Sequence, residues 1–227
     1  MKKSAYKRAL CALFSVFLVL TMVFPGEVAL AASAPGNVAR FSMTGCSAST
    51  VSLSWSKGKG ASGYRIRRYD SKNKKWKTVL IATKGSAIKG TVKKLSPATT
   101  YKLQIHAYKK AGKKTLYSKK AKPLTVVTKP AKVTLQSVKA SGAKITVSWK
   151  KVAASGYQVI YARNKQFKNG ESILVGGSNK AATYYAPYSG TYYVHLRPYK
   201  HLNGKKYYGS WSNTKTVKVN IPKQAYH

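Results

Sequence analysis

Few side chains in this sequence could carry out acid–base catalysis. Beyond residue 31 the only carboxylate side chains are Asp70 and Glu171, far apart in the chain. Hydrolysis of a glycoside usually needs two carboxyl groups within about 5–10 Å of each other. We expect the two acids to lie in different domains, each on the surface near the connection between a third and a fourth strand. The sequence therefore predicts no catalytic carboxylate pair.

The four histidines add little to this chemistry. His106 and His195 alternate with apolar residues, which places them on the outward side of predicted strands, and we interpret them as solvated. His195 and His201 could approach each other across a hairpin, but a metal site usually recruits a third protein ligand, and no acid or cysteine lies near them in sequence. No Ser-His-Asp set can be drawn within one half of the chain. We predict no catalytic residue, no metal site and no cofactor, and therefore no enzyme.

The first 31 residues have the features of an export signal. Basic residues precede an apolar run over 9–24, and Ala29-Leu30-Ala31 supplies small residues at the usual cleavage spacing. We predict a signal peptide over 1–31 and a secreted protein without a transmembrane anchor in its mature part; an uncleaved anchor is the alternative. Cys11 lies in this segment, which leaves Cys46 without a partner for an internal disulfide. We expect Cys46 to be half-buried, with an intermolecular bridge as the alternative.

Positive charge dominates the composition. The sequence has 43 Lys and Arg against 3 Asp and Glu, a formal net charge of +40. The predicted signal holds four of the basic residues and one of the acids, which leaves 39 basic and two acidic side chains. Internal ion pairs cannot neutralise such a surface, so nearly every lysine is solvated or neutralised by a partner. The hydrophobic content of 44% is ordinary for a globular protein and excludes a disordered basic tail.

The rest of the chain contains one small domain twice. The segment SWSKGKGASGY at 54–64 returns one residue shorter as SWKKVAASGY at 148–157. Apolar residues alternate in short runs separated by turn signals, and helical periodicity is missing, which predicts seven strands in each half and two all-β sandwiches. We predict domains over 34–128 and 131–222. The predicted strands are 38–43, 50–56, 63–69, 76–82, 87–93, 100–108 and 116–127, then 132–138, 144–150, 156–162, 172–175, 182–186, 191–199 and 207–220.

Strand alternation also predicts which side chains form the two cores. Residues two apart share one face of a strand, so the apolar members of each run face inward. The Gly-Tyr pair that opens each third strand adds a buried tyrosine. The predicted core residues are Val51, Leu53, Trp55, Tyr64, Tyr101, Leu103, Ile105 and Ala107, then Ile145, Val147, Trp149, Tyr157, Tyr192, Val194, Leu196 and Pro198.

These residues resemble fibronectin type III domains. The tryptophan of the second strand, the Gly-Tyr that opens the third, and Leu95-Ser96-Pro97-Ala98-Thr99-Thr100-Tyr101 are similar to that family's tryptophan, strand-C tyrosine and tyrosine corner. The resemblance covers nearly the whole mature chain. It implies that Tyr101 packs at the edge of the sandwich and hydrogen-bonds backbone. The second half keeps only the Thr191-Tyr192 ending, which weakens the corner assignment for Tyr192 but not the predicted fold.

The lysine-rich style is similar to type III modules in secreted proteins of Gram-positive gut bacteria. The run YKKAGKK at 108–114 is mirrored by YKHLNGKKYY at 199–208. Such modules usually serve as adhesion or spacer modules, sometimes beside catalytic domains, and no catalytic domain is found here. The sequence has Arg68-Tyr69-Asp70 instead of an integrin-binding Arg-Gly-Asp, and the loop between the sixth and seventh predicted strands is KKAGKK at 109–114, so integrin binding is not carried over.

The outward-facing basic residues are the remaining candidates for function. Alternation places arginines on the third and sixth strands outward, and paired lysines cluster in loops and at strand ends. Neighbouring outward residues on a strand are about 7 Å apart, within a Debye length of roughly 8 Å, so their charges repel one another. A polyanion would relieve that repulsion. The predicted binding residues are Arg65, Arg67, Lys102, Lys109, Lys110, Lys113, Lys114, Arg197, Lys205 and Lys206.

The sequence thus favours a secreted, non-catalytic monomer that adheres to an anionic polymer. The candidate partners are teichoic acid of the cell wall, with noncovalent association, and host glycosaminoglycan or mucin. A spacer without a specific ligand is one alternative, since lysines on edge strands also discourage aggregation. Nonspecific binding of extracellular DNA uses the same electrostatics and is the other.

Overall fold

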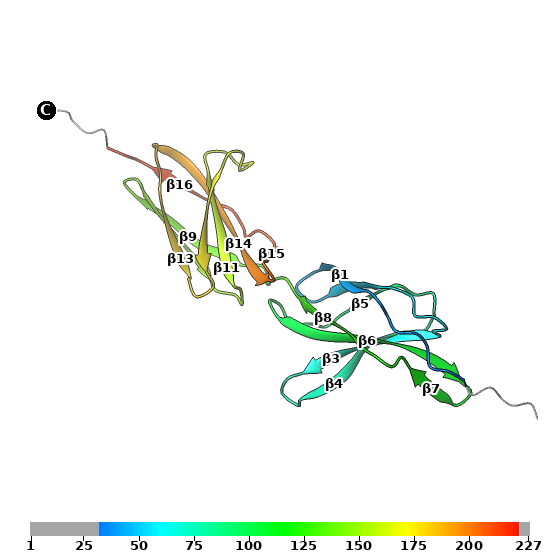
Figure 1. The fold of residues 1–227 in the computed structure, drawn as a ribbon. Helices are drawn as coiled ribbons and strands as arrows, with labels where there is room; N and C mark the ends of the chain where they lie inside the picture. The colour runs from blue at the N-terminus through cyan, green and yellow to red at the C-terminus, as the bar shows by residue number, and fades with distance from the viewer. Residues whose placement is uncertain (1–31, 223–227) are drawn as a thin grey trace, which may run out of the picture. The chain divides into compact units, whose positions relative to one another are not determined.

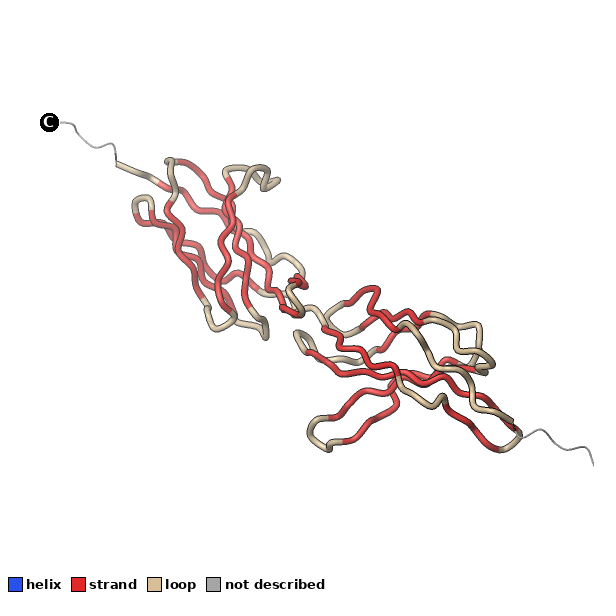
Figure 2. Tube along the Cα trace, in the orientation of Figure 1, coloured by secondary structure: helices blue, strands red, loops and turns tan. Residues whose placement is uncertain are grey.

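The computed structural model describes residues 32–222, and in this part the chain consists of strands and loops (Figure 2). The signal peptide predicted for 1–31 lies outside the described residues. Sixteen strands are present within 32–222, and no helix there is long and apolar enough to cross a membrane. The predicted all-β class is confirmed.

The first sandwich consists of two antiparallel sheets, most of whose strands are labelled in Figure 1. One sheet has the order β1-β2-β5, and the other has the order β4-β3-β6-β7, with β8 also paired to β6. The strands are β1 Phe41–Cys46, β2 Val51–Trp55, β3 Gly63–Asp70, β4 Lys75–Ala82, β5 Lys89–Val92, β6 Thr100–Ala111, β7 Lys114–Tyr117 and β8 Lys122–Val127.

The second sandwich repeats this topology. Its sheets have the orders β13-β10-β9 and β12-β11-β14-β15, and β16 also pairs with β14. The predicted duplication is therefore a duplication of strand connectivity as well as of sequence. The strands are β9 Thr134–Ser141, β10 Lys144–Lys150, β11 Gly156–Ala162, β12 Glu171–Gly176, β13 Ala181–Tyr185, β14 Gly190–Leu202, β15 Lys205–Tyr208 and β16 Lys215–Val219.

The seventh strand of each sandwich is interrupted, where the sequence predicts one continuous strand. In the first sandwich Tyr108 pairs with Tyr117, and Ile105 pairs with Lys122. Between these two pairs the chain advances by three residues along β6 and by five along the seventh strand. In the second, Tyr199 pairs with Tyr208 and Val194 with Lys215, which again gives two extra residues. The extra residues cannot join the ladder and bulge out of it. Each strand is therefore divided into two segments.

Aromatic contacts between the two sheets form the centre of each core. The rings of Trp55 and Tyr64 are 5.5 Å apart, and those of Trp149 and Tyr157 are 5.1 Å apart. All four side chains are buried, which confirms their core assignment. Their tyrosine hydroxyls are also satisfied: Tyr64 donates to the Gly85 carbonyl, and Tyr157 donates to the Val152 carbonyl.

The tyrosine corner is present in both sandwiches. The Ser96 amide donates to the Tyr101 hydroxyl at 2.8 Å, as the resemblance implies. Tyr192 donates to the Tyr188 carbonyl at 3.1 Å. The second corner thus forms although the local sequence lacks the leucine and proline of the first. Its requirement is a tyrosine at the start of β14 and a backbone carbonyl four residues before it.

Tyr108 is buried, whereas its outward phase on β6 predicts exposure. Its ring covers Gly63 on the neighbouring strand, and a Cβ placed on Gly63 would lie 2.6 Å from Tyr108 Cζ. Tyr199 covers Gly156 in the same way. The glycine leaves room for the ring to lie flat on the sheet, so the outward side of the strand is partly closed here.

We expect Gly63→Ala to lower the free energy of unfolding of the first sandwich by about 1–3 kcal/mol, because the new methyl group overlaps the backbone carbonyl oxygen of Ala82 and the Tyr108 ring. Chemical unfolding followed by near-UV circular dichroism measures the change. Gly45→Ala is the matched control, since a Cβ at Gly45 would meet nothing within 4 Å. Equal unfolding midpoints for the two variants would contradict the packing role of Gly63.

Candidate functional site

Four of the predicted binding lysines lie on the β6–β7 hairpin. Lys110, Lys113 and Lys114 are exposed and Lys109 is half-buried. Ala111 pairs with Lys114, which leaves a two-residue turn over 112–113, and Gly112 supplies the positive φ of 55° that the turn requires. The tight turn therefore brings four lysines to the tip of one hairpin.

The β14–β15 hairpin carries two more of the predicted lysines. Its turn is Asn203-Gly204, with φ values of 48° and 75°, the Asn-Gly combination that a two-residue hairpin turn favours. Lys205 and Lys206 follow it and are exposed. Lys206 Nζ lies 5.6 Å from the Tyr199 ring centroid. The two hairpins have the same position in their sandwiches, so each sandwich presents a basic hairpin.

The predicted arginines have partners within the protein. The Arg65 guanidinium lies over the Tyr117 ring at 3.7 Å, and Arg67 donates to the Trp76 carbonyl at 2.9 Å. Both arginines are half-buried. The stacked face of Arg65 is closed to a ligand, and on both arginines only the guanidinium N–H groups that remain free can still bind one.

Arg197 is the most enclosed of the predicted arginines. Its guanidinium lies 3.8 Å from the Tyr208 ring centroid and 4.2 Å from that of Trp211, and Nε donates to Gln158 Oε1 at 2.8 Å. Burial lowers the pKa of Arg197 somewhat. Sequence reasoning missed Trp211, because it lies in the interruption between β15 and β16, where alternation no longer indicates which face of the sheet a side chain occupies.

His195 is not solvated, which corrects the prediction from its outward phase. Its ring lies between Phe167, at 3.6 Å, and Trp211, at 4.0 Å between centroids. Burial, and after it the charge of Arg197, lower the pKa of His195 to about 4. His106 is also engaged, since its Nδ1 lies 3.1 Å from the Ser118 carbonyl. Within residues 32–222 no group of three His, Cys, Asp or Glu could hold a metal ion.

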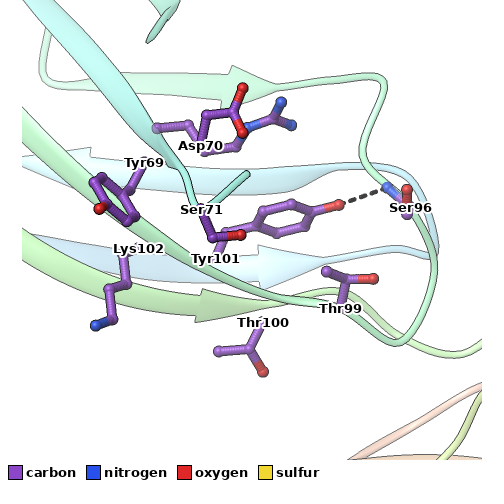
Figure 3. Close-up of a pocket in the computed structure, with 9 residues that line it drawn as sticks. Tyr69, Asp70, Ser71, Ser96, Thr99, Thr100, Tyr101 and Lys102 are labelled. Carbon is purple, nitrogen blue, oxygen red and sulfur yellow. Dashed lines mark hydrogen bonds between the residues drawn. The ribbon is translucent and has the colours of Figure 1, made fainter. Parts of the chain in front are cut away.

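Lys102 lies away from the basic hairpins, at a hollow of about 490 Å³ on the first sandwich (Figure 3). Asp70 and Tyr101 also line it. Asp70 pairs with Lys77 at 2.7 Å, the single ion pair among the described residues. Hydrogen bonds from Lys77 and then Asn73 hold the pKa of Asp70 well below its usual range. Asp70 thus stabilises the β3–β4 turn, and the other basic residues of 32–222 have no carboxylate partner there.

A scan against protein-family models matches the first sandwich. Residues 33–123 match the model of the family described as fibronectin type III domain. The first sandwich has the fibronectin type III fold. The second sandwich has the same strand order, so the chain contains two tandem domains of this fold. A search of curated proteins finds no match.

Several solved structures are similar to this chain. A two-domain fibronectin type III segment of chicken tenascin has 16% identity and a TM-score of 0.47, over 82% of this chain and 100% of that one. The FN1–FN3 domains of chicken CNTN1 have 20% identity and a TM-score of 0.37, over 83% and 68%. The chicken interferon gamma receptor alpha chain has 16% identity and a TM-score of 0.39, over 83% and 99%.

The enclosed histidine predicts a pH dependence of stability. Because the pKa of His195 is about 4 in the folded protein and about 6.5 in an unfolded chain, unfolding takes up a proton between these values. The contribution to stability is complete above about pH 6.5 and is lost as the pH falls through 4. Phe167→Ala opens one side of the ring, so it should raise this pKa and reduce the loss of stability.

Titration of the His195 ring by NMR and unfolding curves between pH 4 and 7 measure both effects. Gln166→Ala is the control, because Gln166 is an exposed neutral residue of the same loop. A His195 pKa near 6.5 in the unchanged protein would contradict the enclosed position of the ring.

Proposed function

We propose that this protein is a secreted, non-catalytic binding module that associates electrostatically with anionic polymers. The observation that carries the proposal is the lack of internal neutralisation. Beyond the predicted signal there are 39 basic and two acidic side chains, and the described residues contain one ion pair. A folded surface of this kind has a positive potential that attracts polyanions from solution.

The two basic hairpins are the proposed centres of contact. Two-residue turns hold the lysines of each hairpin close together, and like charges at this separation repel one another. An anionic polymer removes this repulsion and releases its own counterions on binding. Tyrosines beside the lysines, such as Tyr199 and Tyr207, supply aromatic surface for the rest of the polymer.

An anionic polysaccharide is the proposed partner, either a teichoic acid of the cell wall or a host glycosaminoglycan or mucin. Charge alone gives weak specificity, and affinity comes from several contacts along one chain. Nucleic acid offers the same phosphate charges and is the competing ligand. A spacer that binds no ligand is the other alternative, and a binding experiment separates the three.

The test is retention of the mature protein on immobilised heparin, isolated cell wall and DNA at rising NaCl. Changing Lys109, Lys110, Lys113 and Lys114 to Gln should weaken retention and reduce the salt slope of log K by about 3, since each lost phosphate or sulfate contact removes roughly 0.7–0.9. A control with Lys139, Lys144, Lys150 and Lys151 changed to Gln loses the same charge from exposed positions of the second sandwich.

The hairpin variant should elute at clearly lower salt than the control. Identical elution of the two variants would show that total charge decides retention and would reject the hairpin site. Retention no stronger than that of an unstructured lysine-rich peptide of equal charge would favour the spacer. Preference for DNA over both polysaccharides at equal charge density would replace the proposed partner.

A further inference from the structure

The two sandwiches have hollows at equivalent positions. In the first, the hollow lies between the end of β3, the tyrosine corner and the start of β6 (Figure 3). In the second, it lies between the end of β11, the corner and the start of β14. Tyr101 and Tyr192 correspond, because each stands seven residues before the tyrosine that pairs with the glycine of the third strand. Each hollow also contains the acidic residue of its sandwich, Asp70 or Glu171.

The carboxylate and the tyrosine hydroxyl of the first hollow are hydrogen-bonded within the protein. The Asp70 carboxylate accepts hydrogen bonds from the Asn73 side chain and from the backbone amides of Lys72 and Asn73, in addition to its ion pair with Lys77. The Tyr101 hydroxyl accepts from the Ser96 amide, as the dashed line in Figure 3 marks. These bonds leave little capacity for a ligand, so the first hollow serves as an internal comparison.

The second hollow contains a buried hydroxyl without a partner. Tyr161 is 2% exposed, and its hydroxyl makes no hydrogen bond to any described residue. Its ring stacks on Tyr184, with centroids 4.5 Å apart and planes 17° apart. A buried hydroxyl without a partner costs about 1–3 kcal/mol, and a ligand that supplies the partner recovers this. The tyrosine pair therefore forms one wall of the hollow and provides an unused polar group.

The carboxylate of the second hollow is also free of the bonds that hold Asp70. Glu171 forms no ion pair within residues 32–222 and is exposed. Burial, then the charge of the nearby Glu171 carboxylate and a hydrogen bond from the Tyr184 hydroxyl to it, raise the pKa of Tyr184 to about 12. Glu171 thus lies beside the tyrosine pair, and the lone pairs that Tyr184 does not use can accept hydrogen bonds from a ligand.

Cationic groups line the other side of this hollow. The Arg163 guanidinium lies 5.6 Å from the Tyr188 ring centroid, and Lys168 also lines the hollow. Asn164 closes the loop between them, with its amide bonded to both backbone groups of Lys168. The space has a volume of about 310 Å³, at the lower end of the range for small-ligand sites. It holds donors, an acceptor and aromatic faces in a volume suited to one small ring.

We propose that the second hollow binds one neutral, hydroxyl-bearing sugar ring. Glu171 disfavours an anion, and Arg163 and Lys168 disfavour a cation. A sugar donates hydroxyl hydrogens to the carboxylate, accepts hydrogen bonds from the cations and places its C–H groups on the tyrosine faces. This assignment rests on the proposed function in one respect: the ring is a neutral sugar unit of the anionic polymer that the lysines attract.

The test is NMR titration of the whole mature protein with methyl glucopyranoside, methyl galactopyranoside and N-acetylglucosamine, at a salt concentration that abolishes retention on heparin. At least one should shift the amide resonances of 161–171 and 184–192. Tyr161→Phe should weaken this binding about three- to tenfold while leaving thermal stability unchanged or higher, since it removes an unpartnered hydroxyl. A structural hydroxyl would give the opposite change in stability.

Glu171→Gln should weaken sugar binding to a similar extent, because a neutral amide accepts weaker hydrogen bonds than a carboxylate. Asp70→Asn is the matched control in the first hollow and should leave sugar binding unchanged. A double change of Lys205 and Lys206 to Gln should leave it unchanged as well, while lowering retention on heparin.

Absence of shifts with all three sugars overturns this proposal, as does sugar binding by the Tyr161 and Glu171 variants that is as strong as that of the unchanged protein. Shifts caused by tetramethylammonium but by no sugar would assign the hollow to a cation instead. Sugar binding without retention on either heparin or isolated cell wall would reject the proposed function and keep the sugar site. Retention on heparin without sugar binding would reject the sugar site and keep the proposed function.

Discussion

The contact between tryptophan and tyrosine across the two sheets supports everything else in each sandwich. Trp55 packs on Tyr64 and Trp149 on Tyr157, and apolar residues of both sheets surround each pair. Interactions between charges do not add to the stability of the folded state, because a net charge of +40 destabilises a compact state through self-repulsion. The chain also lacks a disulfide among its described residues, with Cys46 free. Stability therefore comes from burial and backbone hydrogen bonds, which leaves the lysines unconstrained by the core.

Alternation along the strands predicted the cores because it depends only on residues two positions apart. It assigns a side chain to one face, but it does not say how crowded that face is. Tyr108 and His195 are on the predicted outward side and are nevertheless enclosed, the first over Gly63 and the second between Phe167 and Trp211. Their neighbours come from other strands and from loops. The interruption of the seventh strand depends on pairing register, which the sequence of one strand does not contain.

In the candidate site, too, features that depend on neighbours in sequence could be predicted, and features that depend on other strands could not. The basic hairpins could be predicted, since lysines on both sides of a two-residue turn are neighbours in sequence and in space. The roles of the arginines could not. Arg65 on β3 and Arg197 on β14 each stack on the tyrosine that ends the first segment of the divided seventh strand, Tyr117 or Tyr208. The same aromatic position thus receives an arginine from a different strand in each sandwich, and only the register of three strands reveals it.

The two hollows occupy equivalent positions in the duplicated sandwiches, but their carboxylates are bonded differently for a physical reason. Asp70 is the last residue of β3 and caps the short turn that follows, so its oxygens accept hydrogen bonds from residues of that turn. Glu171 begins β12 opposite Tyr161, after a longer loop that is closed by Asn164 instead. Because Glu171 begins a strand and does not precede a tight turn, its carboxylate is not used to cap one, as that of Asp70 is. A charged surface acts over a Debye length and distinguishes polymers poorly, whereas a hollow with a fixed acceptor acts at contact. In the proposals made above, the lysines therefore determine how strongly a polymer is held, and the second hollow determines which sugar it carries.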